Sequence, residues 1–173
     1  MPFAYYDNLS PARQAIYRAS DAISTVPLPQ GVAVARHVQG IRDGLARGHR
    51  AMVQKGCQAL IDTLAEAFDV PPVDVHVLAA RPSDVDGELH GLYEPDEELD
   101  TARISVWMRT AQKKQVVAFK SFLRTLVHEF LHHLDYEHFK LAETFHTEGF
   151  YKRESSLTNA LFAAVVPATS DLR

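Results

Sequence analysis

Residues 115–136 read QVVAFKSFLRTLVHEFLHHLDY, and this stretch decides the fold of the chain. Its apolar side chains recur at intervals of three and four residues, the spacing that places side chains on one face of an α-helix. They are Phe119, Phe122, Leu123, Leu126, Val127, Phe130, Leu131 and Leu134. The pattern predicts a long amphipathic helix whose broad apolar face is buried in the core.

Two strands are predicted before this helix. Residues 73–77 and residues 104–108 each alternate apolar and polar side chains, the period of a strand with one buried face. Between them, residues 81–101 are polar and are predicted to form a long loop, with a short strand near 89–93.

The first 70 residues are predicted to be largely helical. Ser10 is a favourable N-cap and Pro11 a favourable first helical residue, so a helix is expected from 11 to 24. A second helical stretch is predicted from 32 to 68, where the sequence DVPP at 69–72 ends it.

Three glycines interrupt the second stretch at intervals of four residues. Gly40, Gly44 and Gly48 would form a ridge of small residues along one helix face. Charged side chains between them argue against a pair of membrane helices. The glycines are therefore expected to mark either close packing or a break between two water-exposed helices.

The predicted elements follow the order helices, strands, a central helix and a closing helix. The closing helix is predicted from 151 to 166, where Pro167 ends it. This order is typical of an α+β fold with a small mixed or antiparallel sheet. A length of 173 residues fits a single domain at 1–173, with a helical part at 1–70 and the sheet and central helix at 71–173.

The composition is that of a soluble globular protein, with 46% hydrophobic and 23% charged residues. The net charge of −4 offers no general attraction for nucleic acid or for an anionic membrane. Cys57 is the single cysteine, so no internal disulfide can form. With no recognisable signal peptide and no apolar run of about 18 residues, we expect a cytoplasmic protein without membrane or nucleic-acid partners.

The central helix carries the sequence HEFLH at 128–132, an H-E-x-x-H pattern. A helix turns by about 100° per residue, so two histidines four positions apart point the same way and can bind one metal ion. Glu129 lies beside His128 and can act as a general base on a water molecule at that ion. His133 points elsewhere and is expected to face solvent or a neighbouring helix.

A catalytic zinc site takes three protein ligands, so a further ligand is needed. His138 would extend the pattern toward that of the metzincins. That pattern needs a glycine where this chain has Asp135 and a methionine downstream, whereas the last methionine here is Met108. In a continuing helix, His138 would also lie about 120° from His132 and would not converge with it.

Three later residues are the other candidates for the third ligand. Glu143 and Glu148 would give a site with two histidines and one glutamate, but they follow His132 closely for that arrangement. His146 follows His132 by 14 residues, which leaves room for a helix end, a loop and a return. Phe150 can anchor this segment in the core. We favour His146 over the alternatives.

The sequence HEFLH at 128–132, followed by H-x-x-x-F at 146–150, resembles the H-E-x-x-H … H-G-x-x-F pattern of the SprT-like zinc metallopeptidases. That group includes the Spartan-type DNA–protein crosslink proteases. The resemblance covers residues 100–155 and implies a zincin-like fold that holds one Zn²⁺. Thr147 stands where the family has glycine, and no cysteine-rich zinc ribbon follows.

The resemblance also implies a function, that of a zinc-dependent metallopeptidase acting on a peptide or protein substrate. His128, His132 and His146 would be the metal ligands. Glu129 would be the general base that takes a proton from a zinc-bound water and hands it to the leaving amine.

Three further residues are candidates for supporting roles. Tyr151 and Arg153 follow His146 closely enough to donate a hydrogen bond to the oxyanion. Asp135, one turn after the H-E-x-x-H pattern, is placed to orient a ligand imidazole. The alternative function is a zincin-fold protein that binds metal or a partner, as a regulatory or interaction module, without peptidase turnover. Retention of Glu129 favours the enzyme.

Overall fold

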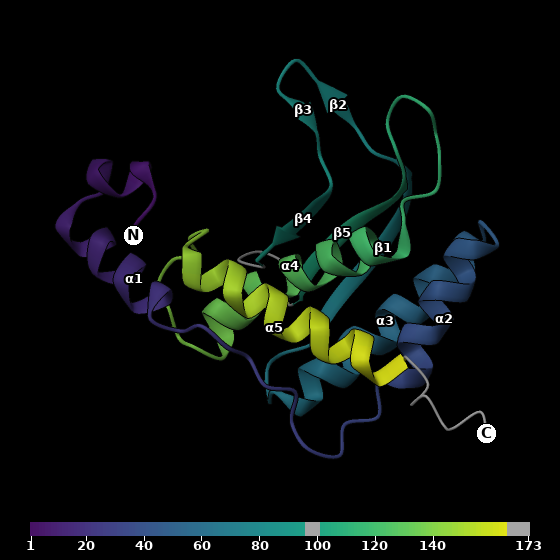
Figure 1. The fold of residues 1–173 in the computed structure, drawn as a ribbon, viewed down its shortest axis with the longest axis horizontal. Helices are drawn as coiled ribbons and strands as arrows, with labels where there is room; N and C mark the ends of the chain where they lie inside the picture. Colours follow the sequence, from purple (N-terminus) through teal and green to yellow (C-terminus); the bar gives the residue numbers. More distant parts are fainter. Residues whose placement is uncertain (96–100, 166–173) are drawn as a thin grey trace, which may run out of the picture.

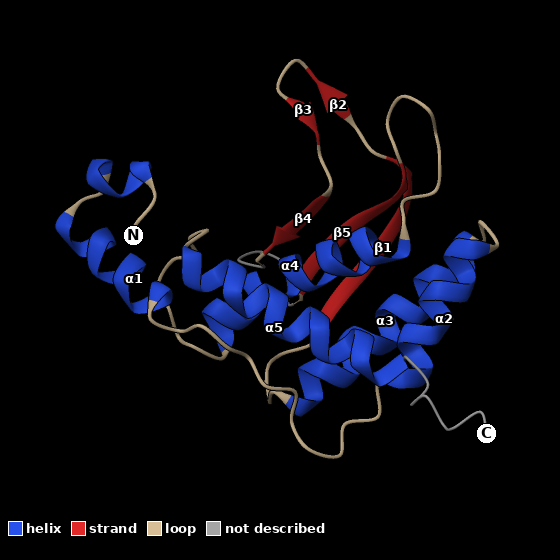
Figure 2. Cartoon of the chain, viewed as in Figure 1, coloured by secondary structure: helices blue, strands red, loops and turns tan. Residues whose placement is uncertain are grey.

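A computed structural model describes residues 1–95 and 101–165 of the chain. Within them the protein is a mixed α+β structure, as predicted, with helices packed on a small sheet (Figure 2). The elements in chain order are the 3₁₀ helix η1 (Ala4–Asn8), α1 (Pro11–Asp21), α2 (Ala35–Ala46), α3 (Arg50–Ala67), β1 (Val73–Ala80), β2 (Ser83–Asp84), β3 (Gly87–Glu88), β4 (Gly91–Glu94), β5 (Ala102–Arg109), α4 (Phe119–Glu137) and α5 (Glu148–Val165).

The main sheet has three strands in the order β1-β5-β4 (Figure 1). β1 runs parallel to β5, with Val75 opposite Ile104, and β4 runs antiparallel to β5, with Tyr93 opposite the same Ile104. The sheet is therefore mixed, and β4 is one of its two edge strands. β2 and β3 form a separate hairpin that projects from the sheet in Figure 1.

Two glutamines of α3 cover the opposite edge of the sheet, that of β1. Gln54 accepts the N–H of Val77 and donates to the carbonyl of Val75, and Gln58 does the same with Val75 and Val73, all at 2.7–2.9 Å. Side-chain amides thus satisfy backbone groups that a further strand would otherwise satisfy. Among the described residues, the outer side of β4 has no strand against it.

The sheet and the central helix share one core. The alternating residues of 73–77 and 104–108 point their apolar side chains into it, as predicted. Of the eight apolar residues predicted for the central helix, seven are buried and Phe119 packs against them. α4 contacts β4 and β5, and α5 packs along α4, so the H-E-x-x-H pattern lies between the edge strand and α5.

The helix predicted over 32–68 is two helices. The chain breaks at Gly48, whose φ of 61° lies in the left-handed region that favours glycine. Gly44 serves the other predicted purpose, because a Cβ there would lie 2.8 Å from Cγ2 of Val53. Both interpretations of the glycine ridge therefore hold, at different glycines.

The long helices begin at other residues than predicted. α4 begins at Phe119 rather than at 115, because the residues before it pair with Arg109 at the end of β5. α5 begins at Glu148, three residues earlier than predicted. The predicted end at 166–167 lies outside the described residues.

The other elements match their predictions more closely. α1 has the predicted cap, in which Ser10 Oγ accepts the N–H of Arg13, but the helix ends at Asp21 rather than at 24. The polar segment 81–101 contains β4 close to the predicted strand at 89–93, and it also contains the unpredicted hairpin.

The helices of the first 70 residues lie at opposite ends of the molecule. Figure 1 shows α1 at one end and α2 and α3 at the other, with α5 running between them. α1 contacts α5, and α2 contacts both α3 and α5. In the part of the chain that the structure describes, no helix is both long enough and apolar enough to cross a membrane.

Candidate metal centre

Three histidine side chains meet at one point. His128 and His132 lie one turn apart on α4, and His146 lies on the loop just before α5. Their Nε2 atoms are 3.0 Å apart for His128 and His146, 3.1 Å for His132 and His146, and 3.3 Å for His128 and His132. The fold thus brings together the three histidines selected from the sequence.

A carboxylate of α5 fixes the proton on His128. Glu154 Oε1 lies 2.8 Å from Nδ1 of His128, and Arg124 donates to the other carboxylate oxygen at 2.9 Å. Burial alone would raise the pKa of Glu154, but these hydrogen bonds outweigh it and hold the pKa below its ordinary value. Because the carboxylate can only accept, Nδ1 of His128 carries the proton and Nε2 presents a lone pair to the site.

A hydroxyl fixes the proton on His132. Nδ1 of His132 lies 2.8 Å from Oγ1 of Thr144, which donates its own proton to Asp135 at 2.7 Å. The hydroxyl must therefore accept from Nδ1, which leaves Nε2 of His132 bare. Burial, followed by the charges of His128 and His146, lowers the pKa of His132 to about 3, so the ring is neutral. Asp135, predicted to orient a ligand imidazole, contacts His132 through this hydroxyl.

The three nitrogens are spaced as ligands of one zinc ion. Two lone pairs 3.3 Å apart repel each other, and a cation between them removes the repulsion. With zinc–nitrogen bonds of about 2.05 Å, the nitrogens of a tetrahedral site lie about 3.3 Å apart. Burial and the neighbouring His128 also lower the pKa of His146, which keeps the third imidazole neutral. The donor set therefore fits Zn²⁺.

The loop between α4 and α5 returns His146 to α4. α4 ends at His138, and Lys140 reverses the chain with a φ of 55°. Thr147 is buried, and its Oγ1 accepts the N–H of Phe150 in the first turn of α5. This capping bond fixes the start of α5 immediately after His146.

Phe150 supports all three imidazoles. Its ring is fully buried, and the ring centroid lies 5.0 Å from that of His128, 4.9 Å from His132 and 5.2 Å from His146. The anchor expected at this position thus restricts the rotation of each candidate ligand.

Glu129 lies beside the histidines and against β4. It is 7% exposed, and burial raises its pKa to about 7, opposed by the charge of His128 and a backbone hydrogen bond with Tyr93. Gly91 allows this approach, because a Cβ there would lie 2.7 Å from Oε1 of Glu129. The edge strand therefore fixes the position of the predicted base.

Two hollows meet at the histidines. A cleft of about 660 Å³ lies toward the start of α4, and a smaller one of about 340 Å³ lies toward its end. Gly91, His128 and Glu129 line both, so the site lies where the two join. Together the hollows form a groove beside β4.

The other candidates for a third ligand are engaged elsewhere. The ring of His138 packs edge-on against aromatic side chains at the end of α4. Arg13 donates to both carboxylate oxygens of Glu143, at 2.7–3.0 Å. Glu148 pairs with Lys152 at 2.9 Å. None of these alternatives joins the three histidines in the structure.

The two residues predicted to stabilise an oxyanion differ in position. Tyr151 is exposed, and its ring centroid lies 5.9 Å from that of His146, so it borders the site. Arg153 is fully buried and donates to Asp135 at 3.0 Å and to the carbonyl of Ser20 at 2.6 Å. A guanidinium enclosed in this way cannot reach a substrate, so the oxyanion role predicted for Arg153 is wrong.

Two supporting residues were missed in the sequence. Glu154 had a usable signal, because it is an acidic residue placed four positions after Phe150 among the buried apolar residues of α5. Thr144 had none, since a threonine in a polar loop is ordinary. Its role exists only because the loop folds back onto His132.

His133 has a structural role that the sequence did not predict. It is buried, with Nε2 2.9 Å from the carbonyl of Pro71 and Nδ1 2.9 Å from the hydroxyl of Tyr93. The carbonyl accepts, so Nε2 donates and Nδ1 accepts from Tyr93. His133 thus ties α4 to β4 and to the segment before β1, and the expectation that it faces solvent or a helix is wrong.

The chain matches no protein-family model, and searches of curated proteins and of solved structures give no match. A function for it is therefore inferred from its own residues and their geometry.

Proposed function

We propose that the chain is a zinc-dependent metallopeptidase of the zincin type. The observation that carries the proposal is the convergence of three histidine Nε2 atoms within 3.3 Å, two of them held as bare nitrogens by hydrogen bonds on the far side of the ring. His128, His132 and His146 would hold one Zn²⁺, and Glu129 would act beside them as the general base.

The chemistry divides between the ion and the side chains. A zinc ion held there supplies Lewis acidity to water and to a peptide carbonyl. Glu129 accepts a proton from the attacking water and passes it to the leaving amine. A buried carboxylate with a raised pKa suits both directions of transfer near neutral pH. Tyr151, beside His146, is the candidate donor to the developing oxyanion.

The groove beside β4 supports a peptide or protein substrate. An extended peptide can add to the outer side of an edge strand through backbone hydrogen bonds. Glu129 and the three histidines lie at the junction of the two hollows beside this strand. A substrate laid along β4 would therefore pass the reacting groups in an extended form.

The resemblance to the SprT-like enzymes supports the same proposal. The pattern pairs two ligands on a helix with a third on the returning chain and an aromatic residue after it, and Phe150 packs against all three rings. Thr147, which replaces the glycine of the family, fits the turn because its hydroxyl caps α5. A nucleic-acid-linked role is not part of the proposal, because the net charge is −4.

The ligand assignment is tested by the metal content of purified variants. We expect about one zinc per chain in the wild type and its loss in His128→Ala and His146→Ala, because two histidines alone hold zinc weakly. His138→Ala is the matched control and should retain zinc. Full zinc retention in His146→Ala, with loss in His138→Ala, would overturn the assignment.

The catalytic assignment is tested with Glu129→Gln. This variant should bind zinc like the wild type but lose at least a hundredfold in the hydrolysis of an unfolded protein substrate, because the amide cannot take a proton. Hydrolysis at the wild-type rate would remove Glu129 as the base. A zinc-loaded wild type that cleaves no peptide would favour the alternative, a metal-binding interaction module without turnover.

A further inference from the structure

The larger hollow beside the histidines contains a feature that the proposed hydrolysis does not use. This cleft of about 660 Å³ extends away from Glu129 toward the start of α4, and Arg81, the residue that follows β1, lines it. The cleft therefore joins the reacting groups to a buried arginine.

Arg81 has more hydrogen-bond donors than partners. It is 9% exposed, its Nη1 lies a long 3.4 Å from Oε2 of Glu88, and its Nε has no partner among the described residues. Glu88 also accepts the N–H of Ala111, and it does not line the cleft. A guanidinium offers five N–H donors, and leaving them unpaired in a buried position is costly.

The start of α4 faces the same cleft. Ala118 is the N-cap residue and makes no side-chain capping bond, and the first turn contains no acidic residue. Ala118 and Ser121 both line the cleft. The first N–H groups of a helix lack intrahelical partners and carry partial positive charge, so this end of α4 favours an anion.

The two carboxylates on the cleft wall do not supply that anion. Glu154 is already paired with Arg124 and with a ligand histidine. Glu129 lies at the other end, where the two hollows join. Burial, followed by the charge of Arg81, lowers the pKa of His90 on the cleft wall, so the positive charge of Arg81 is felt there.

We propose that this cleft is a subsite for a carboxylate group of the substrate, bound by Arg81 and the N-terminus of α4. The proposal rests on the proposed peptidase function and gives it a substrate class. That class is peptides that carry an acidic side chain, or their own C-terminal carboxylate, a few residues from the bond that is cleaved. A carboxylate suits the planar fork of a guanidinium, which can bind both of its oxygens.

The test measures the binding of defined peptides to the zinc-loaded Glu129→Gln protein, which does not consume them. One set is capped at both ends and carries Glu or Gln at successive positions. A second set has no acidic side chain and ends in a free carboxylate or in an amide. We expect one set to show a carboxylate preference of roughly tenfold or more, the size of a charge-assisted hydrogen bond, and the responding set identifies the source.

Arg81→Gln should abolish the preference, and Arg109→Gln is its matched control. Arg109 also lies at the end of a strand of the sheet, but it does not line the cleft, so its variant should keep the preference. Ser121 is exposed, and Ser121→Asp would place a fixed carboxylate at the start of α4 without disturbing the core. We expect Ser121→Asp to remove the preference and Ser121→Asn to retain it.

The outcomes separate the subsite from the peptidase proposal. Equal binding of carboxylate and amide peptides, or a preference that survives in both Arg81→Gln and Ser121→Asp, would overturn the subsite even if the wild type cleaves peptides. A preference that depends on Arg81 in a protein whose wild type cleaves nothing would support the subsite and refute the peptidase. Thermal unfolding of each variant confirms that it is folded.

Discussion

At the scale of single residues, the orientation of His132 depends on a chain of hydrogen bonds through the protein interior. Thr144 accepts from the ring and donates to Asp135, which accepts from Arg153 at 3.0 Å. Arg153 in turn donates to the carbonyl of Ser20 in α1 at 2.6 Å. A candidate metal ligand is thus held by residues from α1, the α4–α5 loop and α5. Such partners fix the tautomer and direction of a ligand ring.

Thr144→Val tests this chain of hydrogen bonds. Valine has the shape of threonine but can neither accept from Nδ1 of His132 nor donate to Asp135. We expect zinc affinity to fall roughly 10- to 100-fold, the usual effect of removing the partner of a ligand histidine. Competition with a chromophoric chelator measures the dissociation constant. Thr144→Ser keeps the hydroxyl and should bind zinc like the wild type, and undiminished affinity in Thr144→Val would contradict the assignment.

At the scale of elements, α5 completes the site by packing between α1 and α4. Its side chains Phe150 and Glu154 contact the ligand histidines. Its first turn lies directly on the end of α1, where the N–H of Gly149 donates to Oδ1 of Asp21 at 2.8 Å. A Cβ at Gly149 would overlap the backbone carbonyl of Asp21, so only glycine permits this approach.

Gly149→Ala should therefore destabilise the protein. The added methyl group must push α1 away from α5, and overpacking of this kind costs about 1–3 kcal/mol. Urea unfolding measures the change in the free energy of unfolding. Gly40→Ala is the matched control, because a Cβ there meets no atom within 4 Å and alanine favours the helix by about 0.5–1 kcal/mol. Equal stability of the two variants would disprove the close packing of α1 on α5.

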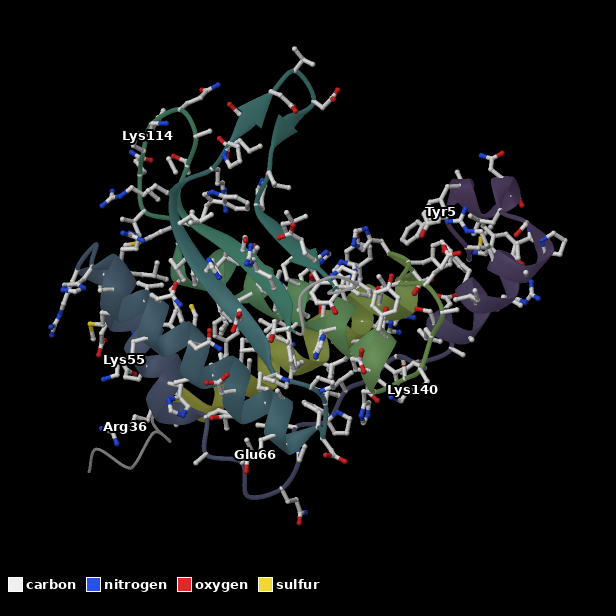
Figure 3. The ribbon with its side chains drawn as sticks, turned by 180° about the vertical axis from the view of Figure 1, so that it is seen from behind. Tyr5, Arg36, Lys55, Glu66, Lys114 and Lys140 are labelled. Atoms are coloured by element: carbon white, nitrogen blue, oxygen red, sulfur yellow. The ribbon has the colours of Figure 1, made fainter. Side chains whose placement is uncertain are left out.

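At the scale of the whole molecule, the N-terminal segment braces the loop that carries His146. Tyr5 donates its hydroxyl to the carbonyl of His146 at 2.7 Å, and Arg13 holds Glu143 in the same loop. In Figure 3, Tyr5 and Lys140 lie at one end of the molecule, and Arg36 and Lys55 lie at the other. The α1 end thus supports the candidate metal centre, whereas α2 and α3 cover the core.

Removing the metal should lower the stability of the whole chain. The ligands come from α4 and from the start of α5, so an ion bound there stabilises the folded state against unfolding. At a free zinc concentration 1,000 times the dissociation constant, the gain is about 4 kcal/mol, or roughly 8–16 °C in the unfolding temperature. Calorimetry with zinc and with EDTA measures it. His128→Ala should unfold at the same temperature in both, and an unchanged wild type would refute the metal centre.

The sequence by itself determined the elements whose apolar periodicity is strong. Residues 73–77 and 104–108 became strands, and the apolar face of 119–134 became the buried face of α4. It also paired His128 with His132, because helical geometry fixes the relative direction of residues four apart. Local periodicity is sufficient for these predictions, since it depends only on neighbours along the chain.

The tertiary structure alone decided everything that depends on contacts between distant residues. The returning loop brings His146 to α4, and it also gives Thr144 its role. Arg153 is locked against Asp135 and the end of α1 instead of facing a substrate. No spacing in the sequence encodes these contacts, because each depends on how α1, α4 and α5 pack, and packing depends on the shape of the whole core.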